Sequence, residues 1–140
     1  MALPATDQRM QSQADLAAET LLSRAHQQAI LATAAEMAAF LQSLLGQRIT
    51  AYITGSADAK AVGKWARGER RPSLAATTKL RDAYHVAILV AMADDEETAR
   101  AWFLGMNPSL RDRSPAYAIR ELPDGGKQAM DAARYFVAHG

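Results

Sequence analysis

The sequence is marked by an absence of cysteine and a scarcity of aromatic residues. None of the 140 residues is cysteine, so disulfide bonds and thiolate metal sites are excluded, and a reducing cytoplasm is compatible with the chain. Aromatic side chains make up only 6%, whereas alanine, leucine, glutamine and arginine are plentiful, which favours helices over strands. Because no alternating strand pattern, internal repeat or low-complexity linker is visible, we predict an all-α fold.

Long apolar runs are also lacking. No stretch approaches the roughly 18 residues that a membrane span needs. The N-terminal residues MALPATDQRM have neither the basic start nor the apolar middle of a signal peptide. We therefore expect a soluble, cytoplasmic protein without a membrane partner.

Signatures of catalysis are lacking as well. The three histidines, His26, His85 and His139, are scattered and have no metal-binding spacing. The segment DGGK at 124–127 lacks the pattern of a phosphate-binding loop, and the acidic run at 94–97 suits the start of a helix. We expect a binding protein that is not an enzyme and needs neither metal nor cofactor.

Apolar residues recur at three-and-four spacing through most of the chain, which predicts helices. The first nine residues are expected to form a frayed tail, and 11–45 a long helix that breaks near 23–28. Glycines or prolines then separate the following expected helices: 48–54, 58–67, Pro72 to about Asp94, a helix that ends at Gly105, Ser114–Arg120, and 127–138. These elements group into an N-terminal helical segment (1–45), a middle segment (46–93) and a C-terminal segment (94–140).

Positive charge is concentrated in the middle of the chain. Residues 46–81 hold eight basic and two acidic residues, whereas 1–45 hold two and four, and 82–140 hold six and nine. Local asymmetry of this kind is typical of a surface that binds a polyanion. A solvated basic face is the alternative interpretation.

The segment WARGERRPS, residues 65–73, lies at the joint between two expected helices. Val62 and Trp65 are three residues apart and should point inward, where the tryptophan anchors helix 58–67 in the core. The basic residues follow the opposite face and continue past Gly68, where the helix is expected to end and where cations can hold phosphates. The predicted DNA-binding residues are Lys60, Lys64, Arg67, Arg70 and Arg71.

This region resembles the helix-turn-helix of Xre-type (Cro/repressor-like) regulators. Their recognition helix reads apolar-x-x-Trp-x-x-Gly, then basic residues and a proline, which here are Val62, Trp65, Gly68, Arg70–Arg71 and Pro72. The preceding helix, RITAYITG, departs from the usual Gln-x-x-Leu-Ala. The resemblance implies an Xre-like bundle over 46–93 that binds operator DNA through its second short helix.

The C-terminal segment resembles the toxin-binding domain of the Xre/MbcA/ParS family of antitoxins. The matching features are Trp102, the turn Asn107–Pro108 with Leu110, Ser114–Pro115, and Gly126 before a closing helix. Arg111–Asp112–Arg113 is a departure, because relatives often have glycines there. The resemblance implies an antitoxin of a type II toxin–antitoxin pair that neutralises a RES-domain, NAD-degrading toxin.

Further expectations follow from the family resemblance. It implies a homodimer that forms a hetero-oligomer with the toxin and autoregulates its operon. We expect the toxin-binding residues to be Trp102, Asn107, Arg111, Arg113, Arg134, Tyr135, His139 and Gly140. Core packing is the alternative role for Trp102 and Tyr135. The alternative functions are a stand-alone repressor with a C-terminal dimerisation or interaction domain, and a protein-interaction module that no longer binds DNA.

Overall fold

The protein is all-helical. The computed structural model describes residues 5–139, with side chains described from residue 7, and these residues form α-helices, one 3-10 helix and no strand. The elements are α1 (Ala5–Leu31), α2 (Ala34–Leu45), α3 (Gln47–Thr54), α4 (Ala59–Ala66), α5 (Leu74–Ala93), α6 (Glu96–Leu104), η1 (Pro108–Leu110), α7 (Pro115–Glu121) and α8 (Gly125–His139). The prediction of an all-α fold is confirmed.

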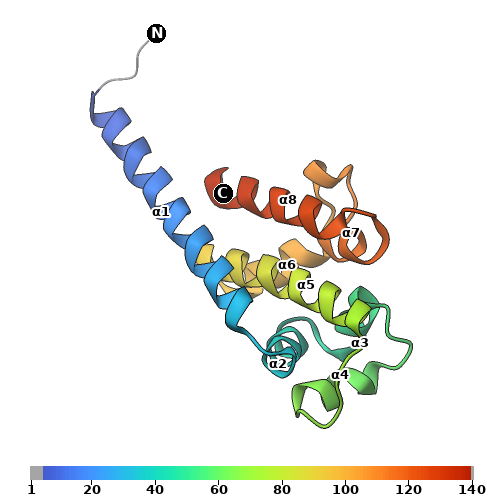
Figure 1. Cartoon of the computed structure of the whole chain (residues 1–140). Coiled ribbons are helices and arrows are strands. Elements are labelled where there is room, and N and C mark those ends of the chain that lie inside the picture. Colours follow the sequence, from blue (N-terminus) through green and yellow to red (C-terminus); the bar gives the residue numbers. More distant parts are fainter. Residues whose placement is uncertain (1–4, 140) are drawn as a thin grey trace.

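Helix α5 forms the centre of the molecule. It contacts α1, α2, α3, α6, α7 and α8, and Figure 1 shows it running between α2 and α8. Its sequence is apolar on several sides, and Leu80, Ala83, Ala87, Leu89 and Val90 are completely buried. Its second half, 86–93, is apolar all round, and such a segment belongs in the interior, where each large aliphatic side chain contributes about 1.5–3 kcal/mol.

The break in the long N-terminal helix lies at Ala32–Thr33, so the predicted position at 23–28 is wrong. The cause is a capping box at the start of α2: the Thr33 hydroxyl accepts from the Glu36 amide at 3.1 Å, and the Glu36 carboxylate accepts from the Thr33 amide at 3.0 Å. These hydrogen bonds also lower the pKa of Glu36. The guanidinium of Arg81 donates to the carbonyls of Ala29 and Ala32 and so closes the end of α1.

Three other boundaries differ from the sequence-based expectation. Helix α1 already begins at Ala5, so most of the predicted tail is helical, whereas residues 1–4 lie outside the described part of the chain. Pro72 precedes α5, because the Ser73 hydroxyl caps that helix by accepting from the Ala76 amide at 3.1 Å. Helix α8 begins at Gly125, two residues before the predicted start.

One hydrophobic cluster joins all three predicted segments. It includes Leu41 from the first segment, Trp65 and Leu89 from the second, and Phe103 and Ala133 from the third. The predicted borders fall between helices, at Gly46 and Asp94. The surfaces described below therefore lie on one shared core. Among the described residues, no helix is both long and apolar enough to cross a membrane.

Candidate nucleic-acid and partner interfaces

Helices α3 and α4 form a pair of short helices joined by the turn 55–58. Gly55 ends α3 in the left-handed conformation with φ of 77°, which glycine adopts without strain, and Asp58 caps α4 by accepting from the Lys60 amide at 2.9 Å. Helix α4 packs on α2 and α3 (Figure 1). Two short helices and a tight turn are thus fixed in one arrangement on the core.

The buried side of α4 is formed by Val62 and Trp65, as predicted. Val62 is fully buried and Trp65 is 4% exposed. The buried indole Nε1 has no hydrogen-bond partner among the described residues, so packing holds the ring in place. Trp65 anchors the helix and leaves its opposite side for the solvent.

That opposite side carries three of the five predicted DNA-binding cations, and the other two lie in the loop after the helix, where they line two small hollows beside Trp65. Lys60, Lys64 and Arg67 are exposed on α4 and its C-cap, and Arg70 and Arg71 are exposed in the following loop. We call these five residues the basic surface. Their clustering can hold a polyanion such as a nucleic-acid backbone.

Arg67 differs from the other cations of the basic surface. Its guanidinium pairs with the Glu69 carboxylate through bonds of 2.9 and 3.2 Å, and this contact raises the pKa of Arg67 and lowers that of Glu69. The other four cations have no acidic partner within 4 Å in the described part of the chain. Lys60, Lys64, Arg70 and Arg71 are therefore the cations of the surface that form no ion pair in the described residues, and the charge of Lys64 also helps to lower the pKa of Glu69.

Two other cations of the basic segment 46–81 bind backbone carbonyls within the fold instead of facing the solvent. Arg81 caps α1, as described above, and the ammonium of Lys79 donates to the Arg120 carbonyl at 2.7 Å. Arg120 in turn donates to the Tyr52 carbonyl, and its guanidinium lies 4.5 Å from the centre of the Tyr52 ring. Sequence counting cannot separate these structural cations from the exposed ones.

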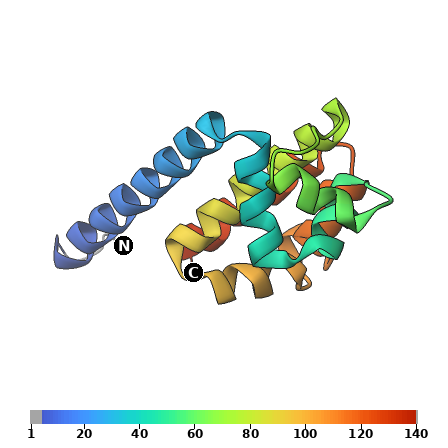
Figure 2. The same ribbon diagram turned by 90° about the horizontal axis from the view of Figure 1, so that it is seen from below.

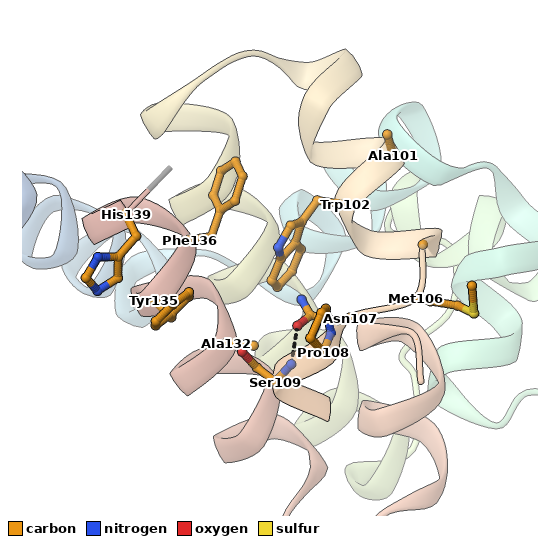
Figure 3. A pocket seen from close by; sticks show the side chains of 11 residues that line it. Ala101, Trp102, Met106, Asn107, Pro108, Ser109, Ala132, Tyr135, Phe136 and His139 are labelled. Carbon is orange, nitrogen blue, oxygen red and sulfur yellow. Dashed lines mark hydrogen bonds between the residues drawn. The ribbon is translucent and has the colours of Figure 1, made fainter. Parts of the chain in front are cut away.

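A groove of about 650 Å³ lies on a different part of the molecule, between α6, η1 and α8. Figure 3 shows Trp102 from α6, Asn107, Pro108 and Ser109 from the connector, and Tyr135, Phe136 and His139 from α8 around this hollow. The Asn107 side chain accepts from the Ser109 amide at 2.9 Å and so fixes η1 beside the groove. Residues from about 101 to 139 thus converge on one site.

Aromatic side chains give the groove its character. The ring centres of Trp102 and Phe136 are 6.2 Å apart, and those of Tyr135 and His139 are 4.3 Å apart. Trp102 and Phe136 are half-buried, whereas Tyr135 is 61% and Met106 82% exposed. Exposed aromatic and methionine side chains around a hollow are enriched at protein interfaces.

The predicted toxin-binding residues divide into two sets. Trp102, Asn107, Tyr135 and His139 line the groove. Arg111 and Arg113 follow η1 and do not line it; Arg113 is half-buried and its Nε donates to the Leu110 carbonyl at 3.2 Å. Gly140 lies outside the described residues.

Arg134 lines a separate, smaller hollow of about 340 Å³ with Asp82, His85, Lys127 and Asp131. Burial, the neighbouring His26 and Arg134 lower the pKa of His85, and burial raises the pKa of Asp82. The His26 and His85 ring centres are 5.6 Å apart. This hollow does not share lining residues with the groove.

The turn after η1 has an uncommon backbone. Arg111 and Asp112 have φ of 55° and 65°, and among the described residues they are the non-glycine positions with positive φ. This conformation costs most residues about 1 kcal/mol and suits glycine. Both residues lie within Arg111–Asp112–Arg113, the stretch in which the sequence departs from the resembled pattern.

The sequence alone did not identify Met106, Pro108, Ser109 and Phe136 as part of the groove. The signal for them is indirect: a glycine stop at Gly105 and the spacing of Ala132, Phe136 and His139 on one helix face. Only the tertiary arrangement, in which α6 packs on α7 and η1 packs on α8, shows that these segments face one hollow.

No protein-family model, no curated protein and no solved structure matches the chain. In the described residues no group of three or more histidine, aspartate or glutamate side chains is arranged to hold a metal ion. The function is therefore inferred from the two surfaces together with the resemblance described in the sequence analysis.

Proposed function

We propose that this protein is an antitoxin that binds and neutralises a RES-domain, NAD-degrading toxin, and that binds operator DNA to autoregulate its operon. The observation that carries the proposal is the convergence of Trp102, Asn107, Tyr135 and His139 on one groove. These residues are dispersed over almost forty positions of the sequence, and the resemblance assigns all four to toxin contact. The aromatic rings provide the large, rigid contact area that protein interfaces favour.

The backbone of the connector gives a second line of support. Glycines are common in the resembled family where this chain has Arg111–Asp112–Arg113, and the first two of these residues have the positive φ that glycine prefers. Because the backbone here has the conformation that glycine prefers, the departure in sequence is compatible with the family's pattern.

The DNA-binding part of the proposal rests on the basic surface. Helix α4 is the proposed recognition helix of an Xre-like helix-turn-helix, and Lys60 and Lys64 on its exposed side are the proposed contacts in the major groove. Arg70 and Arg71 are placed after the helix to hold phosphates. The protein acts as a homodimer, which matches the two-fold symmetry of a pseudo-palindromic operator, and forms a hetero-oligomer with the toxin.

The test uses the purified chain and the purified product of the neighbouring gene. The chain is expected to inhibit NAD degradation by that product at near-stoichiometric concentration. It is also expected to retard DNA from upstream of its own gene, with an affinity that falls steeply as salt rises. NAD degradation that continues with excess protein would contradict the antitoxin function.

A stand-alone repressor is the second candidate, and the basic surface supports it equally. In that case DNA binding is retained and the neighbouring gene product neither binds the groove nor degrades NAD. The same experiment therefore separates the two candidates.

A further inference from the structure

Within the described part of the chain, the N-terminal half of α1 is not covered by another helix. In Figures 1 and 2 it extends away from the other helices, and every side chain from Asp7 to Thr20 except the half-buried Ala18 is exposed. A helix of this length without packing is only marginally stable in water. A second surface that covers it would therefore add to its stability.

The exposed half carries a seam of residues at alternating three- and four-residue steps. The seam consists of Asp7, Met10, Ala14, Ala17, Leu21 and Arg24. Such spacing is that of the a and d positions of a coiled coil. Four apolar positions form the middle, and one acidic and one basic residue close the two ends.

This arrangement is complementary to itself in one direction. When two copies of the seam run antiparallel, Asp7 lies opposite the partner's Arg24, Met10 opposite the partner's Leu21, and Ala14 opposite the partner's Ala17. Each layer then contains two large apolar residues, two alanines, or an ion pair. A parallel pair would instead place Asp7 against the partner's Asp7 and Arg24 against the partner's Arg24, which like-charge repulsion disfavours.

Five of the six seam residues are exposed and therefore lie away from the contacts of α1 with its own body. Ala25 and Ala29, which are buried within the body's hydrophobic core, are on an adjacent side of the helix, and only the half-buried Leu21 belongs to both sides. A second helix can lie along the seam without displacing α5. Alanines at the middle layers allow the two backbones to approach closely.

We propose that a second copy of this chain covers the seam, so that two α1 helices pair antiparallel and form the homodimer. This inference assigns a surface and a register to the homodimer of the proposed function. Its test requires neither DNA nor toxin, so that a failure here is distinguishable from a failure of the antitoxin function.

The first test is sedimentation of the full chain over a range of concentrations. The wild-type chain is expected to be a dimer at micromolar concentration. Arg24→Asp puts two acidic residues in each end layer and is expected to weaken the dimer about tenfold. The double change Asp7→Arg with Arg24→Asp exchanges the charges and is expected to restore it.

Leu16→Glu is the matched control, because Leu16 is 63% exposed on the other side of the same helix, and it should leave the dimer unchanged. Circular dichroism verifies that each variant remains helical. A monomeric wild-type chain at 100 times that concentration would overturn the proposal. A dimer that is insensitive to Arg24→Asp would do the same.

The second test determines the direction of pairing by disulfide formation, which the lack of native cysteine makes simple. In the antiparallel register, residue 10 and its symmetry mate are separated by about 16 Å along the axis, beyond the reach of a disulfide. Met10→Cys alone should therefore remain unlinked, and a mixture of Met10→Cys and Leu21→Cys chains should cross-link. Rapid cross-linking of Met10→Cys alone would show a parallel pair and contradict the proposed register.

Discussion

The basic surface and the groove differ in almost every physical property. The basic surface is a row of exposed cations on α4 and the loop after it, held in place by a buried tryptophan on the other side of the helix. The groove is a hollow of about 650 Å³ whose wall is formed by the rings of Trp102, Tyr135 and Phe136. Charge attracts a polyanion over distance and is screened by salt, whereas aromatic area binds through close packing that excludes water. The two surfaces are therefore suited to two different kinds of partner.

Both surfaces nevertheless depend on α5. Helices α3 and α8 contact it directly, and the shared cluster includes Trp65 from one side and Phe103 from the other. Changes at the exposed side chains should thus separate the two binding activities, whereas changes in the core should remove both.

The largest effect is expected from a change in the shared core, at the start of α8. Gly125→Ala places a methyl group against the Ala118 carbonyl at the contact of α7 with α8. Overpacking against the backbone is expected to destabilise the fold by about 3 kcal/mol. Because the core is shared, thermal denaturation should show one transition at lower temperature, and DNA binding should be lost with it. The exposed Gln128→Ala is the control, and two separate transitions would contradict a common core.

Tyr135→Ala should weaken toxin binding and leave DNA binding unchanged. Tyr135 is 61% exposed in the groove, so its removal leaves the fold almost unchanged. The loss of an aromatic contact at the centre of an interface is expected to cost about 2 kcal/mol, or roughly 30-fold in toxin affinity, with DNA affinity unchanged. Calorimetry measures both. Tyr117→Ala, which lies outside the groove, should leave toxin binding as it is.

The converse change is Arg70→Ala with Arg71→Ala. Two phosphate contacts are lost, so the slope of log affinity against log salt should fall by about 1.8, and DNA affinity at physiological salt about tenfold. Binding should weaken equally on specific and unrelated DNA, and toxin neutralisation should be retained. Lys127→Ala removes a distant exposed cation as the control. An unchanged salt slope would show that these arginines do not contact DNA.

Arg111→Gly tests the turn beside the groove. Because Arg111 has φ of 55°, glycine should relieve backbone strain and raise the free energy of unfolding by about 0.5–1 kcal/mol in urea denaturation. Arg113→Gly, at a neighbouring position without positive φ, should instead destabilise the fold. A loss of stability in Arg111→Gly would show that the side chain contributes more than the strained backbone costs.

The smallest effect concerns pH. The pKa of His85 is below its usual 6.5, because burial and the positive charge of His26 and Arg134 disfavour the charged ring. The unfolded chain therefore binds a proton more readily, so the free energy of unfolding should fall as the pH drops from 7.5 through 6.5. His85→Gln should flatten this dependence, whereas His139→Gln should not. An equal slope in His85→Gln would assign the effect to other groups.

Local chemistry allowed most of the helices to be predicted from the sequence. Gly55, Asp58 and Ser114 mark ends of helices because a left-handed glycine or a capping side chain satisfies the exposed backbone there. The two faces of α4 were predictable from helical spacing, since Val62 and Trp65 share one side and Lys60, Lys64 and Arg67 share the other.

Tertiary contacts account for the features that could not be predicted. The capping box of Thr33 and Glu36 is a local pattern, but Arg81, which also closes the end of α1, is about fifty residues away from the carbonyls that it caps. The role of Lys79 depends on Arg120, and the groove depends on how α6 and α8 are placed around η1. No pattern within a short window contains this information.

The most direct test of the central claim is growth and cellular NAD in cells that express the neighbouring gene. We predict that this gene alone arrests growth and depletes NAD, and that co-expression of the wild-type chain or its Arg70→Ala, Arg71→Ala variant restores both. The Tyr135→Ala variant, present at the same level, should restore them only weakly. A neighbouring gene without toxicity, or toxicity that the wild-type chain does not relieve, would contradict the account.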